Sequence, residues 1–289
     1  MGAGASSILG TEGDGAHETG LGDLPESCIA EVMLRLDPPE ICRLARLSRT
    51  FRGAASADFV WETKLPKNYT YLLEKAFGVK WREVLRDRKE IYARLCRRNP
   101  FDGGTKEFWL EKYKGRLCMS ISSKVLLITG MDDRRYWNYI PSKESRFHVV
   151  AYLQQIWWFE VNGEIEFNFP PGIYSLYFRL HLGRATRRLG HRICSTEHVH
   201  GWNIKPVRFQ LWTSDGQHAL CHCNLNEPGY WIRYHVGDFI VESAEVATKV
   251  KFSMKQIDCT HTKGGLCVDS VFICPKGFRQ GKVSPSPPC

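Results

Sequence analysis

The chain has 289 residues and a formal net charge of +9 at pH 7, and 43% of its residues are hydrophobic and 12% aromatic. This composition is too apolar and too rich in rings for a disordered chain, and the length suits two domains or one domain with a large appendage. No stretch approaches the ~18 uninterrupted apolar residues of a membrane-spanning helix. The N-terminus also lacks a basic segment followed by an apolar run, so neither a secreted nor an integral membrane protein is expected.

The charge is unevenly distributed along the chain. Residues 1–40 contain eight acidic residues against the single Arg35, so the rest of the chain carries the whole positive excess. This asymmetry indicates separate partners for the two ends. Basic clusters at residues 134–135 and 184–192 lie in no recognisable nucleic-acid motif, so we expect solvated loops there and no nucleic-acid partner.

The eleven cysteines are odd in number and show no framework spacing, which favours reduced thiols in the cytoplasm, the nucleus or both. A group at residues 218–223 comes nearest to a metal motif, through His218, Cys221, His222 and Cys223. Its members alternate across an expected strand and no Cys-x-x-Cys pair accompanies them, so ordinary thiols are favoured over zinc. We expect neither a metal nor a cofactor.

Residues 1–20 are mostly small and acidic without any period, and they are predicted to be a disordered lead. Their start fits the pattern for N-myristoylation of Gly2 after removal of Met1. Such a short pattern also arises by accident in Gly- and Ser-rich termini. One acyl chain gives only marginal, reversible membrane binding, so at most transient membrane contact follows.

Residues 21–66 are predicted to be helical. Asp23 can cap a first helix with Glu26 at N3, and Asp37 with Glu40 repeats the arrangement for a second. Apolar residues recur at helical spacing in both segments: Ile29, Val32, Met33, Leu36, then Ile41, Leu44 and Ala45. So small a unit cannot hide all its apolar residues, which implies a partner surface.

These residues resemble an F-box. The resemblance rests on Leu24, Pro25, Ile29, Val32, Leu36, Leu44, Ala45, Leu47, Ser48, Phe51, Arg52 and Trp61. It implies docking onto the Skp-type adaptor, and through it a cullin, of an SCF ubiquitin ligase. The adaptor-binding face would be formed or supported by Leu24, Pro25, Ile29, Val32, Leu36 and Leu44. A helical cap packed on the chain's own second domain is the alternative.

Residues 67–114 keep helical spacing, interrupted by Gly78 and ended by Asn99 and Pro100. We interpret this segment as a semi-rigid connector. Thr105 would cap one more short helix after two glycines.

Residues 115–276 change to a period of two and predict an all-β sandwich, followed by a flexible tail at 277–289. Asn162 and Gly163 form the strongest hairpin signal, and Asp215 and Gly216 form a second. The expected strands cover 125–129, 147–152, 157–169, 174–182, 207–212, 230–236, 246–254 and 268–274. No nucleophile elbow, phosphate-binding loop or metalloprotease motif occurs, so the histidines are expected to be structural.

This second region resembles the phloem protein 2 domain, a plant lectin domain similar to the jasmonate-induced tobacco lectin. The matching residues are Thr129 and Gly130, Arg135 to Trp137, Ser145 to Phe147, Leu153, Ile156 to Val161, Gly163 to Ile165, Gly201 and Trp202, Tyr230 to Ile232, Val236 to Phe239, Lys251 to Met254, Lys263 to Leu266, and Val268. An F-box ahead of it is similar to the plant F-box and phloem-lectin fusion family. The resemblance implies an α+β multidomain chain with a jelly-roll, lectin-like sandwich.

The combination implies a non-catalytic substrate receptor of an E3 ligase that recognises a glycosylated or plain protein target. A carbohydrate-binding lectin acting without the ligase is the alternative. A glycan-processing enzyme would need a paired carboxylate cleft, which the sequence does not indicate.

Three residues are the candidates for binding a sugar or a target: Trp137, Tyr139 and Gln256. Rings stack on the apolar faces of sugars, while amides and carboxylates take their hydroxyls. In the tobacco-type lectins tryptophans stand at both ends of the first strand, where this chain has Thr129 or Gly130 and then Tyr139. Gln256 replaces an expected acidic residue, so weakened or altered sugar binding is expected. Trp158 is expected in the core, and for Trp137 a core position is as well supported as a binding position.

Overall fold

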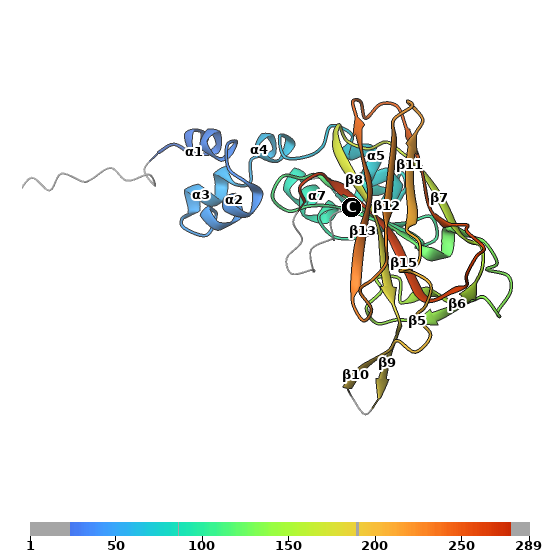
Figure 1. The fold of residues 1–289 in the computed structure, drawn as a ribbon. Helices are drawn as coiled ribbons and strands as arrows, with labels where there is room; N and C mark the ends of the chain where they lie inside the picture. Colours follow the sequence, from blue (N-terminus) through green and yellow to red (C-terminus); the bar gives the residue numbers. More distant parts are fainter. Residues whose placement is uncertain (1–23, 86, 189–190, 279–289) are drawn as a thin grey trace, which may run out of the picture. The chain divides into compact units, whose positions relative to one another are not determined.

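The computed structural model describes residues 24–85, 87–188 and 191–278. The chain divides into two compact units between Val60 and Trp61 (Figure 1). The expected lead, the acylation candidate Gly2, the cap Asp23 and most of the expected tail lie outside the described residues. Within the described ranges, no helix combines the length and the hydrophobicity needed to cross a bilayer.

The first unit is built of short helices. They are α1 (Glu26–Met33), α2 (Pro38–Leu44), α3 (Arg49–Ala54) and α4 (Asp58–Glu62), the last of which runs across the division between the units. The Glu40 carboxylate accepts a hydrogen bond from Asp37 N at 3.4 Å, which confirms the expected capping box at the start of α2. Helix α1 packs against α3 and buries Ile29, Ala30 and Met33.

The expected connector does not stand apart from the second unit. Its helices are α5 (Tyr69–Phe77), α6 (Trp81–Val84) and α7 (Arg88–Leu95). Asn68 Nδ2 donates to Asn168 O at 2.7 Å, and the Tyr71 ring meets Phe167 edge-on at 5.2 Å, so α5 packs on the sandwich. The expected helix after Thr105 is wrong: residues 106–110 form a strand whose side chains are mostly buried.

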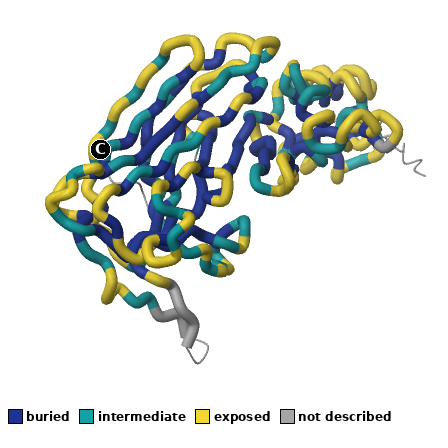
Figure 2. The backbone as a smooth tube through the Cα atoms, turned by 90° about the vertical axis from the view of Figure 1, so that its right-hand side faces the viewer, coloured by how far each residue is buried: buried dark blue, intermediate teal, exposed yellow. Residues whose placement is uncertain are grey.

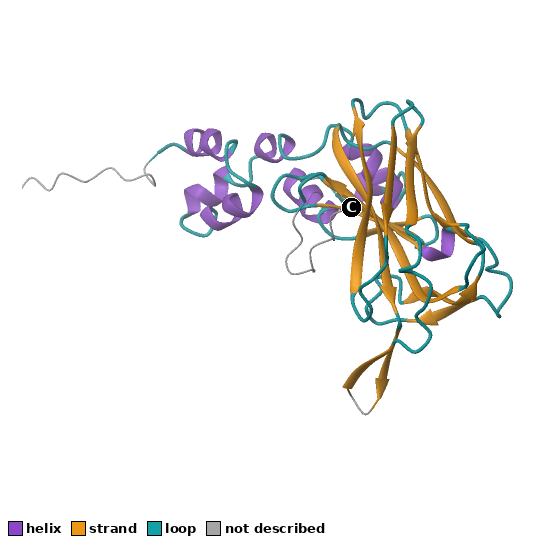
Figure 3. Ribbon diagram, in the orientation of Figure 1, coloured by secondary structure: helices purple, strands orange, loops and turns teal. Residues whose placement is uncertain are grey.

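The strands make up the rest of the second unit (Figure 3). They are β1 (Asn99–Phe101), β2 (Lys106–Leu110), β3 (Leu117–Ser122), β4 (Leu127–Ile128), β5 (Trp137–Pro141), β6 (Val149–Ile156), β7 (Phe159–Phe167), β8 (Gly172–Leu182), β9 (Arg184–Arg188), β10 (His191–Ser195), β11 (Val207–Thr213), β12 (His218–Cys223), β13 (Trp231–Val241), β14 (Thr248–Gln256) and β15 (Lys263–Pro275).

Two antiparallel sheets pack face to face, as the period of two predicts. The larger sheet is organised around β15, which pairs with β3, β6 and β8, and β8 pairs in turn with β13. The smaller sheet has the order β12-β11-β14-β7-β4. Phe178 of β8 contacts Phe209 of β11 and Phe252 of β14, so one aromatic core joins the sheets. Figure 2 shows buried backbone along these strands and exposed backbone at the turns between them.

The expected hairpin at Asn162 and Gly163 is wrong, because β7 runs straight through both residues. They pair with Ser253 and Phe252 of β14. A Cβ on Gly163 would lie 2.4 Å from Phe252 Cε2, so the glycine is needed for space rather than for a turn. The second signal is confirmed: Gly216 has φ +89° between β11 and β12.

Candidate functional site

The first unit leaves several apolar side chains at its surface. Leu24, Val32 and Leu47 are 41%, 49% and 69% exposed, and Pro25 is also exposed. We call these four residues the exposed apolar set. Exposed apolar residues on so small a unit mark an interaction surface, and three of them are among the residues predicted for the adaptor.

The other residues predicted for the adaptor differ in position. Ile29 is 2% exposed and packs inside the unit, so of the two roles predicted for it, forming or supporting the adaptor face, only the supporting one fits. Leu36 and Leu44 are half-buried. The regular spacing along α1 did not separate Ile29 from Val32, because residues three apart on a helix lie at the two borders of one broad face.

The three residues predicted for sugar or target binding are not brought together on the surface. Trp137 is 1% exposed, stacks on Phe159 and donates from Nε1 to Thr129 O at 3.2 Å. Gln256 is 4% exposed and its amide donates to Lys205 O. Trp137 and Gln256 therefore belong to the core, which is a correction, and Tyr139 alone offers an exposed ring.

The exposed tryptophans lie elsewhere, in the turn between β6 and β7. Trp157 is 51% and Trp158 is 45% exposed, so the expectation that Trp158 is a core residue is wrong. An indole held at a turn presents an apolar face with little freedom to lose, which suits stacking on a ligand. The sequence did contain a signal for an exposed tryptophan here. Trp157 and Trp158 are consecutive in a strand-like run, and a strand can bury only one of two neighbouring side chains on a given face.

A carboxylate orients this turn. Glu160 accepts hydrogen bonds from Trp158 Nε1 at 3.0 Å and from Asn162 Nδ2 at 3.0 Å, and Lys255 Nζ lies 2.7 Å away. The hydrogen bonds from Lys255, Asn162 and Trp158 hold the pKa of Glu160 at about 2, well below the usual value for a glutamate. The ring of Trp158 thus lies beside a hydrogen-bond acceptor that is charged at neutral pH.

Lys263 anchors the same turn from inside. Its side chain is 0% exposed, and Nζ donates to Trp157 O at 2.6 Å and to the carbonyls of Gln256 and Asp258 at 3.0 Å each. Desolvation lowers the pKa of this ammonium, while the three carbonyls satisfy all its donors. A buried lysine thus ties β15 to the tryptophan turn.

No metal centre is assembled in the described part of the chain: no three His, Cys, Asp or Glu side chains come together there. Residues 218–223 form β12, whose side chains alternate between exposed and half-buried. Burial raises the pKa of the Cys267 and Cys274 thiols to about 12, so both are unreactive core residues.

Comparison with known proteins agrees with both halves of the chain. The F-box domain family matches residues 21–63, and the phloem protein 2 family matches residues 116–275. The F-box protein PP2-A13 of Arabidopsis thaliana is 62% identical over 256 residues, which cover 88% of each chain. The F-box protein PP2-A15 of the same plant is 55% identical over 288 residues, covering 96% of this chain and 95% of that one.

Solved structures show only slight likeness. A family 35 carbohydrate-binding module from Clostridium thermocellum is 11% identical, with a TM-score of 0.32, and covers 54% of this chain and 96% of that one. A TM-score this low establishes no shared fold. The two matching families, in this order and at this identity to their plant relatives, place the chain in the family of plant F-box proteins that carry a phloem protein 2 domain.

Proposed function

We propose that this protein is a substrate-receptor subunit of an SCF ubiquitin ligase, in which the first unit docks on a Skp-type adaptor and the second holds a protein target. The observation that carries the proposal is the exposed apolar set on a helical unit that matches the F-box family. Side chains of this kind contribute on the order of 1.5 to 3 kcal/mol each when a partner covers them fully.

The receptor would contribute proximity rather than chemistry. Binding a target next to the charged conjugating enzyme raises the effective concentration of its lysines. The proposal therefore assigns no catalytic side chain to this chain and no cofactor.

Adaptor binding by the purified full chain tests the proposal. Leu24→Ala with Pro25→Ala should weaken adaptor binding by about tenfold or more, because it truncates two residues of the exposed apolar set. Leu127→Ala removes a leucine that is 73% exposed, more than Leu24, from β4 of the second unit and should leave binding unchanged. Circular dichroism establishes that each variant is folded, and unchanged adaptor binding by the folded double variant contradicts the docking model.

Glycan recognition is the second candidate function, with or without the ligase. Trp157, Trp158 and Tyr139 are exposed, and Glu160 lies within hydrogen-bond distance of Trp158. An aromatic face beside a fixed carboxylate is the combination that binds a sugar ring and its hydroxyls. Because Trp137 and Gln256 are buried, the candidate sugar site is placed at the β6–β7 turn instead.

A glycan array probed with the wild-type chain, Trp158→Ala and Tyr139→Ala tests the sugar hypothesis. Binding that disappears in either variant supports a lectin role and shows which ring carries it. A blank array together with an identified unglycosylated target rejects that role and leaves direct protein recognition.

Acylation of Gly2 is a separate proposal, which rests on the terminal sequence pattern alone. Gly2→Ala should move any membrane-associated fraction into the soluble fraction, because the acyl chain is attached to the amine of this glycine. A myristate label that never reaches the wild-type chain contradicts the proposal.

A further inference from the structure

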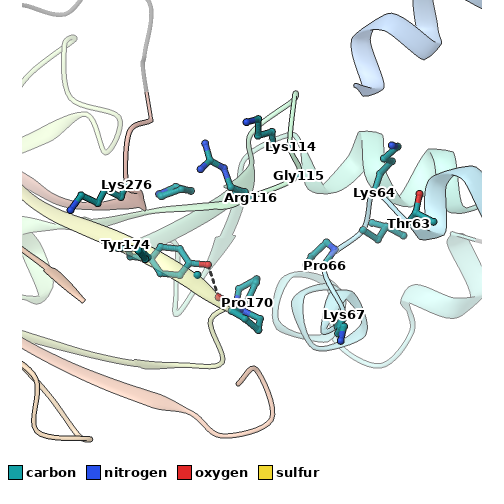
Figure 4. Close-up of a pocket in the computed structure, with 15 residues that line it drawn as sticks. Thr63, Lys64, Pro66, Lys67, Lys114, Gly115, Arg116, Pro170, Tyr174 and Lys276 are labelled. Atoms are coloured by element: carbon teal, nitrogen blue, oxygen red, sulfur yellow. Dashed lines mark hydrogen bonds between the residues drawn. The ribbon is translucent and has the colours of Figure 1, made fainter. Parts of the chain in front are cut away.

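A hollow of about 670 Å³ lies in the second unit, where four segments of the chain meet (Figure 4). The segments are residues 63–67 ahead of α5, 114–116 in the β2–β3 turn, 170–174 at the start of β8, and 275–276 at the end of β15. This volume is in the range of ligand pockets and accommodates several residues of an extended peptide.

The walls of the hollow are held in place by short contacts. Gly115 has φ +61°, and a Cβ there would lie 2.5 Å from Lys64 O, so the β2–β3 turn packs directly on the segment before α5. The Tyr174 hydroxyl donates to Pro170 O at 2.8 Å, and Lys276 N donates to Ile173 O at 2.8 Å. The hollow is thus a built feature of the second unit.

The lining is strongly basic. It includes Lys64, Lys67, Lys114, Arg116 and Lys276, and none of the described residues that line it is acidic. Acidic neighbours outside the lining lie near some of these cations: Asp238 is 2.9 Å from Lys276, and Glu111 is 3.8 Å from Arg116. The hollow therefore keeps a positive excess and attracts anionic groups.

The Arg116 guanidinium has a hydrogen-bond donor without an acceptor among the described residues. Arg116 Nε is buried, and no described residue accepts a hydrogen bond from it, because the Glu111 carboxylate is too distant at 3.8 Å. A carboxylate or a phosphate presents oxygen atoms that match the fork of a guanidinium.

The hollow is also lined by apolar groups. Pro66, Pro170 and Tyr174 belong to the lining, and Figure 4 shows them among the basic side chains, with Lys67 beside Pro66. Ile173, also in the lining, is 46% exposed. Apolar surface combined with charged side chains in one lining is suited to binding a segment of a protein.

We propose that this hollow binds a short extended segment of a protein partner in which carboxylate or phosphate groups flank apolar side chains. The inference rests on the proposed function, since such a segment would be the part of the target that the receptor recognises. The apolar part of the lining distinguishes the site from one for a small anion, and the concave lining distinguishes it from a flat basic face for a membrane.

Fluorescence anisotropy of the full chain with labelled peptides tests the proposal. Three peptides share alternating apolar and charged positions, and the charged positions are glutamate in the first, phosphoserine in the second and lysine in the third. The first, the second or both should bind and the third should not, and the two anionic peptides distinguish carboxylate from phosphate as the group recognised. Binding should weaken as ionic strength rises from about 0.05 M to about 0.5 M, because salt screens exposed charges.

Two matched variants locate the site. Lys67→Gln with Lys114→Gln removes two exposed lysines of the lining and should weaken peptide binding by about five- to tenfold. Lys124→Gln with Lys143→Gln removes the same charge from exposed lysines outside the lining and should change binding by less than about twofold. Equal losses in both variants, or no binding of either anionic peptide, overturn the proposal.

Two further measurements distinguish a peptide in the hollow from a membrane and from an effect on the adaptor. The chain is tested with phosphatidylserine vesicles in the same way. If it binds the vesicles through Lys67 and Lys114 but binds neither anionic peptide, the ligand is a membrane and the proposal is overturned. Adaptor binding measured on the same samples tests the ligase role independently. If a variant loses peptide binding but keeps adaptor binding, the substitution affects the hollow and not the adaptor surface. If the chain binds the peptide but never the adaptor, the peptide site in the hollow is supported and the proposed ligase function is contradicted.

Discussion

Gly163 illustrates how a single residue limits the packing between neighbouring strands. It lies within β7 opposite Phe252, and a Cβ would come 2.4 Å from Phe252 Cε2 and 2.8 Å from Leu126 Cδ2. Gly163→Ala should therefore lower the free energy of unfolding by about 1 to 3 kcal/mol through overpacking. Combining it with Phe252→Leu, which shortens the opposing side chain, should restore part of the loss in urea unfolding. A Gly163→Ala chain as stable as the wild type would show that the ring moves aside at no cost.

Glu160 predicts a pH dependence. Its pKa of about 2 in the folded chain lies below the ordinary 4.5, so the native state binds this proton less tightly than the unfolded state does. The stabilisation is complete above about pH 4.5 and is lost as the pH falls toward about 2. Unfolding measured across this window should show a smaller pH dependence for Glu160→Gln than for the wild type. Glu164→Gln, an exposed residue on the same strand, serves as the control, and equal slopes in all three chains would contradict the assignment.

Lys263 links stability to the tryptophan turn. Lys263→Met keeps an unbranched side chain, one heavy atom shorter, but removes three charge-assisted donors, which leaves the carbonyls of Trp157, Gln256 and Asp258 without this partner. The variant should lose about 2 kcal/mol or more of stability. Indole fluorescence should also report a looser turn, and an unchanged melting temperature would indicate that water replaces the ammonium without cost.

Among the elements, α3 depends on its cap. Ser48 Oγ accepts a hydrogen bond from Phe51 N at 3.2 Å, which satisfies one of the unpaired amides of the first turn. Ser48→Ala should cost about 1 kcal/mol in the first unit. Ser27→Ala, at an exposed position of α1, is the control, and equal effects of the two changes on thermal unfolding would contradict the capping role.

Local sequence signals predicted the elements whose structure is set locally. The capping residues Asp37 and Glu40 start α2 as expected, and the turn at Gly216 follows from its positive φ. The same kind of signal failed at Asn162 and Gly163, because pairing with β14 keeps both residues extended. It failed again at residues 106–110, where pairing of β2 with β3 outweighs local helical preference.

The candidate sites were predicted in part for a related reason. The apolar excess of the helical unit indicated a partner surface, and Leu24 and Val32 are exposed as that requires. Alternation along a strand shows which residues share a face, but it does not show where the opposite sheet ends. Trp158 was therefore assigned to the core although it is exposed, and alternation left Trp137 undecided between the core and the site although it is buried. The basic hollow could not be predicted, since its four segments are distant in the sequence.

At the scale of the whole molecule, each unit has its own candidate surface. The first unit carries the exposed apolar set, and the second carries the tryptophan turn and the basic hollow. A receptor needs such separate surfaces, because it must hold the adaptor and the target at the same time. The uneven charge of the chain fits this division, since the acidic residues gather ahead of the basic second unit.

Affinity purification of the full chain from plant tissue, followed by mass spectrometry of its partners, tests the ligase role most directly. The wild-type chain should retain a Skp-type adaptor and a cullin. Leu24→Ala with Pro25→Ala should lose both, while Leu127→Ala should keep both. A wild-type chain that retains its other partners but never an adaptor, or a folded double variant that retains the adaptor fully, would contradict the account.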